Sequence, residues 1–298
     1  MFDTTPQLHC GRFRLDIGQP RIMGIVNVTP DSFSDGGALA DADAAVAHAL
    51  RLIEEGADIV DIGGESTRPG APAVSVEDEL ARVLPVIEQL AGRIEVPISV
   101  DTSKPGVMQA ALTAGASMVN DVRALTGEGC LDAVAASGAA VCLMHMQGEP
   151  GSMQDAPHYD DVVSDVHRFL AQRIFACEMS GIEKRRIAID PGFGFGKSRT
   201  HNYELLRHLE RFTDLGVVVL AGLSRKSMIG ATTGREVASR VYGSVAAAVI
   251  AAQRGARILR VHDVAATRDA LAVAAEVGWA APAKATGHVA RVAWGDED

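Results

Sequence analysis

Short apolar runs that each end in a polar residue recur along this chain, and they constrain its fold more than any other feature. The residues that close these runs are Asn27, Asp101, Asn120, Asp190, and the pair Arg260 and His262. Functional groups gather in this way at the carboxyl ends of the parallel strands of a (β/α)8 barrel. The pattern therefore predicts an α/β protein, a single (β/α)8 TIM barrel, with a ring of functional side chains at one rim.

Strand and helix patterns alternate without a break along the chain. A β-hairpin is expected at His9–Ile17, where it would plug the bottom of the barrel. Strands are expected up to Val28 and at 58–62, 97–100, 117–119, 140–144, 186–189, 217–220 and 257–261. Helices are expected at 41–55, 76–91, 105–114, 129–137, 159–180, 201–212, 237–253 and 265–277. These pairs predict one catalytic domain over residues 1–279, followed by a short irregular C-terminal tail at 280–298.

Composition excludes several classes of protein. Hydrophobic residues make up 47% of the chain and aromatic residues only 4%, which suits a core of small and branched side chains and argues against base-stacking surfaces. The formal net charge is −10 and no Lys/Arg-rich block is present, so a nucleic-acid partner is not expected. The first eleven residues lack a signal-peptide pattern, and no apolar run is long enough to span a membrane.

The four cysteines are Cys10, Cys130, Cys142 and Cys177. They are widely separated and form none of the close pairs that zinc sites and redox motifs require. We expect them to be reduced packing residues of a cytoplasmic enzyme.

Two predicted loops are longer than a barrel turn requires: residues 27–38, NVTPDSFSDGGA, and residues 63–73, GGESTRPGAPA. Their Gly, Pro, Ser and Asp residues are typical of ordinary surface turns. The same loops carry Phe33 and Arg68, an aromatic residue and a cation beside the rim. This pair favours lids that close over a substrate.

Two further segments follow predicted strands. The glycine-rich segment 192–198, GFGFGKS, matches neither the dinucleotide fingerprint nor the phosphate loop, so we interpret it as a rim loop that forms a wall for a flat ligand. Ser224–Ser227 is predicted to open a helix, where free N–H groups bind anions. For Ser227 alone, an N-cap is an equally good interpretation, whereas Lys226 favours function because it lies so close to a strand end.

Arg260 and His262 are two residues apart on the last strand and therefore project to the same side. Two cationic groups inside a barrel favour a phosphate or diphosphate site. Asn27 by itself is more often a turn former. Beside a diphosphate, it becomes a candidate oxygen ligand for magnesium, which keeps waters and substrate oxygens as its other ligands.

Asp101, Asn120 and Asp190 offer hydrogen-bond acceptors and donors at neighbouring strand ends. A carboxylate accepts two parallel N–H bonds, and a pyrimidinone with an exocyclic amine supplies them. For each residue taken singly, a satisfied structural role is the better interpretation. The three together favour a flat heterocyclic ligand.

These residues lie in segments that resemble the dihydropteroate synthases: MGIVNVTPDSFSDGG, DIGGESTRPGA, SVDTSKP, NDVRAL, CLMHMQG, DPGFGFGK, GLSRKSMIG and RVHDV. The resemblance runs from Met23 to about Leu271. It implies a (β/α)8 barrel that joins 4-aminobenzoate to (7,8-dihydropterin-6-yl)methyl diphosphate and releases pyrophosphate in folate biosynthesis. It also implies a Mg²⁺ cofactor, a cytoplasmic homodimer and a target of sulfonamides.

The resemblance also implies a role for each site residue. The pterin ring is implied to be held by Asp101, Asn120, Asp190, Lys226 and Arg260, with Arg260 stacking on it. The diphosphate is implied to contact Asn27, Thr67, Arg68, Arg260 and His262, and Asn27 to contact the metal. The aminobenzoate pocket is implied to comprise Phe33, Thr67, Arg68, Pro69 and Ser227, and the catalytic residues Asp35, Phe33, Lys226 and Arg260.

Two alternatives share the barrel. A pterin-binding methyltransferase domain holds the ring with the same Asp and Asn residues but hands a methyl group to a corrinoid protein. A non-catalytic paralogue would bind pterin for another partner. The loop at 27–38 and the SRKS segment favour the synthase, because a methyl donor without diphosphate or aminobenzoate needs neither.

Overall fold

Eight parallel strands form the centre of the molecule. The computed structural model describes residues 6–28, 37–66, 73–148, 153 and 157–278, with only the backbone of residues 37–41. The strands close into a barrel in the order β10-β3-β4-β5-β6-β7-β8-β9. Their bounds are β3 Arg21–Asn27, β4 Ile59–Gly63, β5 Ile98–Asp101, β6 Met118–Asp121, β7 Ala140–Met144, β8 Ile187–Asp190, β9 Val218–Ala221 and β10 Ile258–Val261. The predicted (β/α)8 barrel is confirmed.

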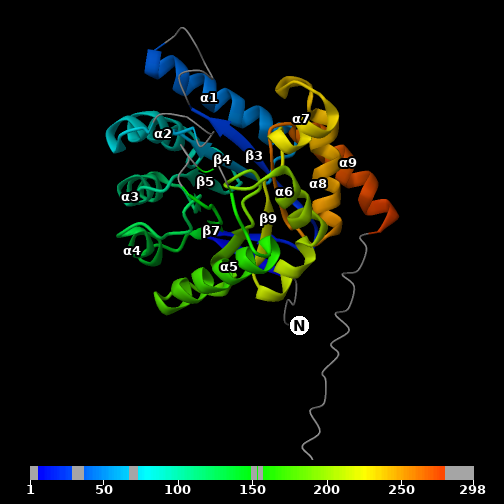
Figure 1. The fold of residues 1–298 in the computed structure, drawn as a ribbon. Helices are drawn as coiled ribbons and strands as arrows, with labels where there is room; N and C mark the ends of the chain where they lie inside the picture. Colours follow the sequence, from blue (N-terminus) through cyan, green and yellow to red (C-terminus); the bar gives the residue numbers. More distant parts are fainter. Residues whose placement is uncertain (1–5, 29–36, 67–72, 149–152, 154–156, 279–298) are drawn as a thin grey trace, which may run out of the picture.

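Helices surround the barrel (Figure 1). Their bounds are α1 Gly37–Glu54, α2 Val76–Leu90, α3 Pro105–Ala114, α4 Cys130–Ala135, α5 Val162–Met179, α6 Arg199–Arg207, α7 Ser227–Thr233, α8 Val241–Gln253 and α9 Val264–Val277. Three short 3₁₀ segments, Lys184–Arg186, Leu209–Leu215 and Val237–Ser239, complete the connections. None of the helices in the described part of the chain combines the length and apolarity of a membrane span.

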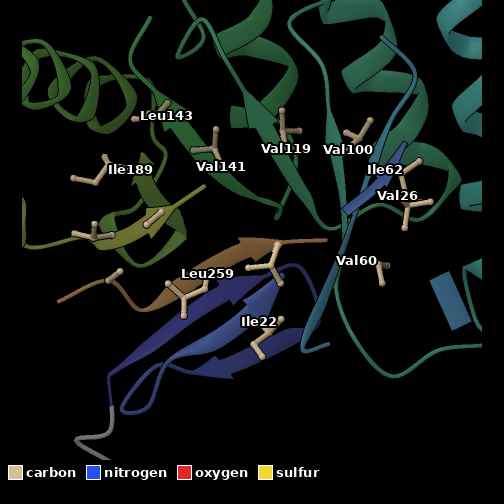
Figure 2. Packing of buried hydrophobic residues seen from close by; sticks show 14 of the residues in the cluster. Ile22, Val26, Val60, Ile62, Val100, Val119, Val141, Leu143, Ile189 and Leu259 are labelled. Atoms are coloured by element: carbon tan, nitrogen blue, oxygen red, sulfur yellow. The ribbon is translucent and has the colours of Figure 1, made fainter. Parts of the chain in front are cut away.

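The main hydrophobic core lies between the barrel and its helices. Alternate strand residues, among them Ile22, Val60 and Leu259, point outward into this layer and pack against the helices (Figure 2). Because successive side chains on a strand face opposite sides, their neighbours along each strand must point into the barrel. The residues that line the barrel interior can therefore be identified as the neighbours of those in the outward core.

A second core fills the lower half of the barrel interior. It combines strand residues such as Met23, Ile59 and Ile258 with Leu8 and Cys10 of an N-terminal hairpin. The hairpin strands are β1 Gln7–Cys10 and β2 Phe13–Asp16, paired antiparallel. The predicted plug is thus confirmed, and the amino-terminal end of the barrel is closed by apolar packing.

Most predicted elements differ from the observed ones by only a few residues at their ends. α5 begins at Val162 rather than 159, because the Asp161 side chain accepts a hydrogen bond from Ser164 N and caps the helix. The helix predicted at 201–212 is divided into α6 and a 3₁₀ segment that together bury Leu205, Leu206, Leu209 and Phe212. The predicted tail at 280–298 lies outside the described residues and stays a prediction.

Candidate active site

The carboxyl-terminal half of the barrel interior is polar. On β10, Leu259 and Val261 pack in the outward core, so Arg260 between them projects inward. The same alternation on the other strands directs Asp61, Asp101, Asn120 and Asp190 into the barrel. The predicted ring is therefore present above the apolar plug, and it contains one residue that the sequence analysis did not name, Asp61.

Arg260 is held by two carboxylates. Its Nε donates to Asp61 Oδ2 at 2.6 Å and its terminal nitrogen donates to Asp101 Oδ2 at 2.6 Å. Asn120 Nδ2 donates to the same oxygen of Asp61 at 3.2 Å. One network thus joins four strands and fixes the directions of Asp101 and Asn120.

Burial and mutual charge compete in this network. Burial alone would lower the pKa of Arg260, but Asp61 and Asp101 outweigh it and raise the pKa above its usual value. Burial raises the pKa of Asp101, and the Arg260 guanidinium opposes that shift. The cation therefore keeps two largely buried carboxylates together.

Two acceptor atoms of the network are unsatisfied. Asp61 Oδ1 and Asn120 Oδ1 are buried and make no hydrogen bond to any described residue. Buried acceptors of this kind are costly unless a ligand supplies donors. The site therefore has two buried acceptors that a ligand with N–H groups would satisfy.

Asp190 lies beside this network. Its Oδ1 accepts a hydrogen bond from Gly192 N at 2.7 Å, and a Cβ at Gly222 would lie 3.4 Å from Asp190 Oδ2 and 3.9 Å from Arg260 Cβ. Glycine at 222 thus lets the main chain pass close to both side chains. Burial raises the pKa of Asp190, while the Gly192 N–H and Lys226 oppose the shift.

Lys226 faces Asp190 from the loop after β9. Its Nζ lies 4.0 Å from the centroid of the Phe195 ring, a cation–π contact. Burial lowers the pKa of Lys226 to about 8, with Asp190 opposing the shift. Phe195 of the glycine-rich segment therefore supports Lys226, while the wall for a flat ligand stays a prediction.

The other predicted residues of the described chain lie at the rim. His262 follows β10, with its Nδ1 3.0 Å from Ser224 Oγ. Ser227 is exposed at the first position of α7, confirming that the SRKS segment opens a helix. Asn27 ends β3, where it pairs with Gly63, and Gly63 pairs in turn with Asp101.

Five predicted site residues, Phe33, Asp35, Thr67, Arg68 and Pro69, lie outside the described residues. The base of the second loop is described. Glu65 Oε1 accepts a hydrogen bond from Val74 N at 2.9 Å, and Lys104 Nζ binds Glu65 Oε2 at 2.7 Å and Glu79 Oε2 at 2.5 Å. The two ends of this loop are therefore tied together.

No group of three His, Cys, Asp or Glu side chains suited to a metal ion occurs in the described chain. The donor set near the rim is a neutral amide, Asn27. Such a set fits a magnesium ion that takes most of its ligands from water and from a substrate diphosphate, and it does not fit a closed protein cage.

Comparisons with known proteins decide the family. The model of a family described as "Pterin binding enzyme" matches residues 23–262. The dihydropteroate synthase of Escherichia coli K12 is 54% identical over 259 residues, which cover 87% of this chain and 92% of that protein. The chain belongs to the dihydropteroate synthase family. As a member of this family it is a transferase.

Solved structures of dihydropteroate synthases are similar over almost their whole length. A Xanthomonas albilineans dihydropteroate synthase with 4-aminobenzoic acid has a TM-score of 0.87 and 64% identity. Another structure from that organism, in complex with 7,8-dihydropteroate, has a TM-score of 0.82 and 58% identity. Each comparison covers 92% of this chain and 98% of the other.

Proposed function

We propose that this chain condenses 4-aminobenzoate with (7,8-dihydropterin-6-yl)methyl diphosphate to give 7,8-dihydropteroate and pyrophosphate. The observation that carries the proposal is the buried rim network, in which Arg260 binds Asp61 and Asp101, Asn120 binds Asp61, and two acceptor atoms are unsatisfied. Relatives solved with 4-aminobenzoic acid and with 7,8-dihydropteroate support the two ends of the reaction.

The pterin ring is assigned to the polar half of the barrel. Asp101, Asn120 and Asp190 accept its N–H groups, and Lys226 donates to one of its acceptors. Asp61 keeps Arg260 and Asn120 in place. The guanidinium of Arg260 presents a flat face, on which the ring stacks in this proposal.

The diphosphate is assigned to the rim around Arg260 and His262, with Thr67 and Arg68 reaching it from the second loop. Mg²⁺ is the metal in this proposal. Asn27 would hold it together with diphosphate oxygens, and the bound ion would stabilise negative charge on the departing pyrophosphate.

The aminobenzoate is assigned to the outer part of the site, next to Phe33, Thr67, Arg68 and Pro69. Its carboxylate is assigned to Ser227 at the first position of α7, where no side chain caps the helix. Two-sided enclosure by the loops would keep water from the reacting carbon.

The reaction needs no protein nucleophile. The amine nitrogen of 4-aminobenzoate bonds to the pterin methylene carbon, the bond from that carbon to the diphosphate oxygen breaks, and the amine gives up one proton. Cations at the rim stabilise the leaving group, while Asp35 is assigned to the amine or to positive charge on the ring. Lys226 and Arg260, with Phe33, complete the proposed catalytic set.

Product analysis tests this function against its methyl-transfer relative. Purified protein is incubated with both substrates and Mg²⁺, and separately with a methylated tetrahydropterin and a corrinoid protein. Formation of 7,8-dihydropteroate in the first mixture supports the synthase. Methylation of the corrinoid, with no dihydropteroate in the first mixture, would overturn it.

The assembly in this proposal is a homodimer in the cytoplasm. Large apolar side chains are exposed on neighbouring helices: Tyr242 on α8 at 86%, and Val273 and Val277 on α9 at 69% and 84%. A patch of this kind favours a protein interface. All four cysteines are buried and form no disulfide, which fits a reducing compartment.

A further inference from the structure

Lys197 is a buried cation that the proposed reaction does not use. The residue is 2% exposed and belongs to the rim loop that joins β8 to α6. Its Nζ lies 2.9 Å from His145 Nδ1, 3.2 Å from the His145 carbonyl oxygen and 3.0 Å from the Phe195 carbonyl oxygen. Three acceptors thus surround one amino group.

Three acceptors match the three N–H bonds of an ammonium. Lys197 donates all three bonds when it is charged and His145 is neutral with an unprotonated Nδ1. Burial and the Lys197 charge lower the pKa of His145 to about 3, which keeps the imidazole neutral. Burial also lowers the pKa of Lys197, with Asp190 opposing that shift and Lys226 adding to it.

The contacts of Lys197 fix the loop that carries Phe195. One N–H bond holds the Phe195 carbonyl, and the other two hold His145, which follows β7 and donates its main-chain N–H to the Asp190 carbonyl. The loop is thereby attached to two neighbouring strand ends. A Cβ at Gly192 would lie 1.8 Å from the His145 oxygen, so the two segments are in direct contact.

Phe195 in turn supports Lys226. The Lys226 ammonium lies over the Phe195 ring, and a Cβ at Gly194 would lie 3.1 Å from Lys226 Cδ. The path from Lys197 to Phe195 and Lys226 consists of one hydrogen bond, one residue of chain and one cation–π contact. The first two steps are buried, and Lys226 at the end is half-buried.

We infer that Lys197 is a positioning residue for pterin recognition, which holds Phe195 so that Lys226 stays aimed at the ring. The inference rests on the proposed function, in which Lys226 contacts the pterin. It assigns no contact with 4-aminobenzoate to Lys197. Loss of Lys197 must therefore weaken binding of the pterin diphosphate and leave binding of 4-aminobenzoate unchanged.

The test compares Lys197→Met with a matched control on the same loop. Tyr159 donates from its hydroxyl to the Gly196 carbonyl at 2.8 Å, so Tyr159→Phe removes one loop bond that does not involve Phe195. Binding of (7,8-dihydropterin-6-yl)methyl diphosphate is measured by calorimetry without 4-aminobenzoate. KM for each substrate and kcat are then measured on the folded fraction.

We expect Lys197→Met to weaken pterin diphosphate binding about tenfold, roughly the effect of losing one buried cation–π contact. KM for 4-aminobenzoate should stay within about twofold, since the ordered loop acts only on the pterin. Tyr159→Phe should change pterin diphosphate binding and the KM for 4-aminobenzoate by no more than about twofold. Phe195→Leu should reproduce the Lys197→Met effect, and the double variant should add little to either single change.

Equal weakening of both substrates, or an equal effect of Tyr159→Phe, would overturn the inference in favour of a general structural role. Should Lys197→Met not fold, His145→Phe takes its place, because it removes one acceptor and keeps the ring. Unchanged pterin binding in that variant also overturns the inference. A wild-type protein that binds the pterin diphosphate but forms no dihydropteroate rejects the proposed function and leaves the binding comparison valid.

Discussion

Asp61 holds the rim together because one fully buried oxygen accepts hydrogen bonds from both Arg260 and Asn120. We expect Asp61→Asn to lower the free energy of unfolding by about 3 kcal/mol, since it leaves a buried guanidinium with one carboxylate instead of two. Pterin diphosphate affinity should fall as well. Denaturant unfolding and calorimetry measure the two effects.

Asp16 supplies the control for this change. It pairs with Arg21 at 3.4 Å on the surface, so Asp16→Asn should change stability by less than about 1 kcal/mol. Similar losses from the two substitutions would show that the buried network has no special role.

A pH dependence of pterin binding follows from Lys226. Burial lowers its pKa to about 8, with Arg260 adding to the shift and Asp190 and Asp101 opposing it. The ammonium exists below that pKa, so affinity for the pterin diphosphate should fall as pH rises through about 8 and be retained below it. Calorimetry between about pH 7 and about pH 9.5 measures this alkaline limb.

Lys226→Met is the variant that tests the assignment. It should bind the pterin diphosphate weakly, and its affinity should lose most of the decrease above about pH 8. Any decrease that remains is due to Lys197. An identical pH profile in the wild type and this variant would contradict the assignment to Lys226.

At the scale of elements, the β8–α6 loop depends on glycine at 192. Gly192 has φ +73°, and a Cβ there would collide with the His145 oxygen at 1.8 Å. Gly181 has φ +85° with nothing within 4 Å. Gly181→Ala should therefore cost about 1 kcal/mol from backbone strain alone, whereas Gly192→Ala should cost more than about 3 kcal/mol. Equal unfolding free energies for the two variants would contradict the close packing of this loop.

The elements themselves follow from local sequence patterns. Apolar runs predict every barrel strand, and helical periodicity predicts most of the helices. The polar residues at strand ends predict that Asp101, Asn120, Asp190 and Arg260 line the rim. The start of α7 is predicted, but its end at Thr233 is not, because its seven residues are too short to show a period.

The site residues that the sequence did not predict depend on partners far away in the chain. Asp61 lies inside the apolar run IVDIG rather than at its end, and its role comes from Arg260, 199 residues away. Lys197 acquires its role from His145, 52 residues away. Local pattern contains no information about such pairs. A charged residue at an inward position of a predicted strand is the one signal that would have revealed Asp61.

At the scale of the whole molecule, the barrel separates stability from chemistry. Leu8, Cys10 and the inward apolar residues close one end, and the polar network occupies the other. A cavity of about 330 Å³ near Arg12 and Ser117 lies at the closed end, away from the rim network. Its position does not alter the assignment of the active site, which is based on charge and unsatisfied acceptors.

The proposed homodimer predicts a second whole-molecule result. The double substitution Tyr242→Asp and Val273→Asp should convert a dimer to a monomer in sedimentation, because charges would be buried in an apolar interface. Phe175 on α5 is also exposed, at 64%, and Phe175→Asp should leave the dimer intact. A wild-type monomer, or dissociation by Phe175→Asp alone, would contradict the assignment of the interface to α8 and α9.

The central claim is tested most directly by pyrophosphate release from (7,8-dihydropterin-6-yl)methyl diphosphate with Mg²⁺, with and without 4-aminobenzoate. The account predicts rapid release that depends on 4-aminobenzoate, matches the dihydropteroate formed, and is inhibited by a sulfonamide that competes with 4-aminobenzoate. Tight binding of the pterin diphosphate with no release in either mixture would contradict the account.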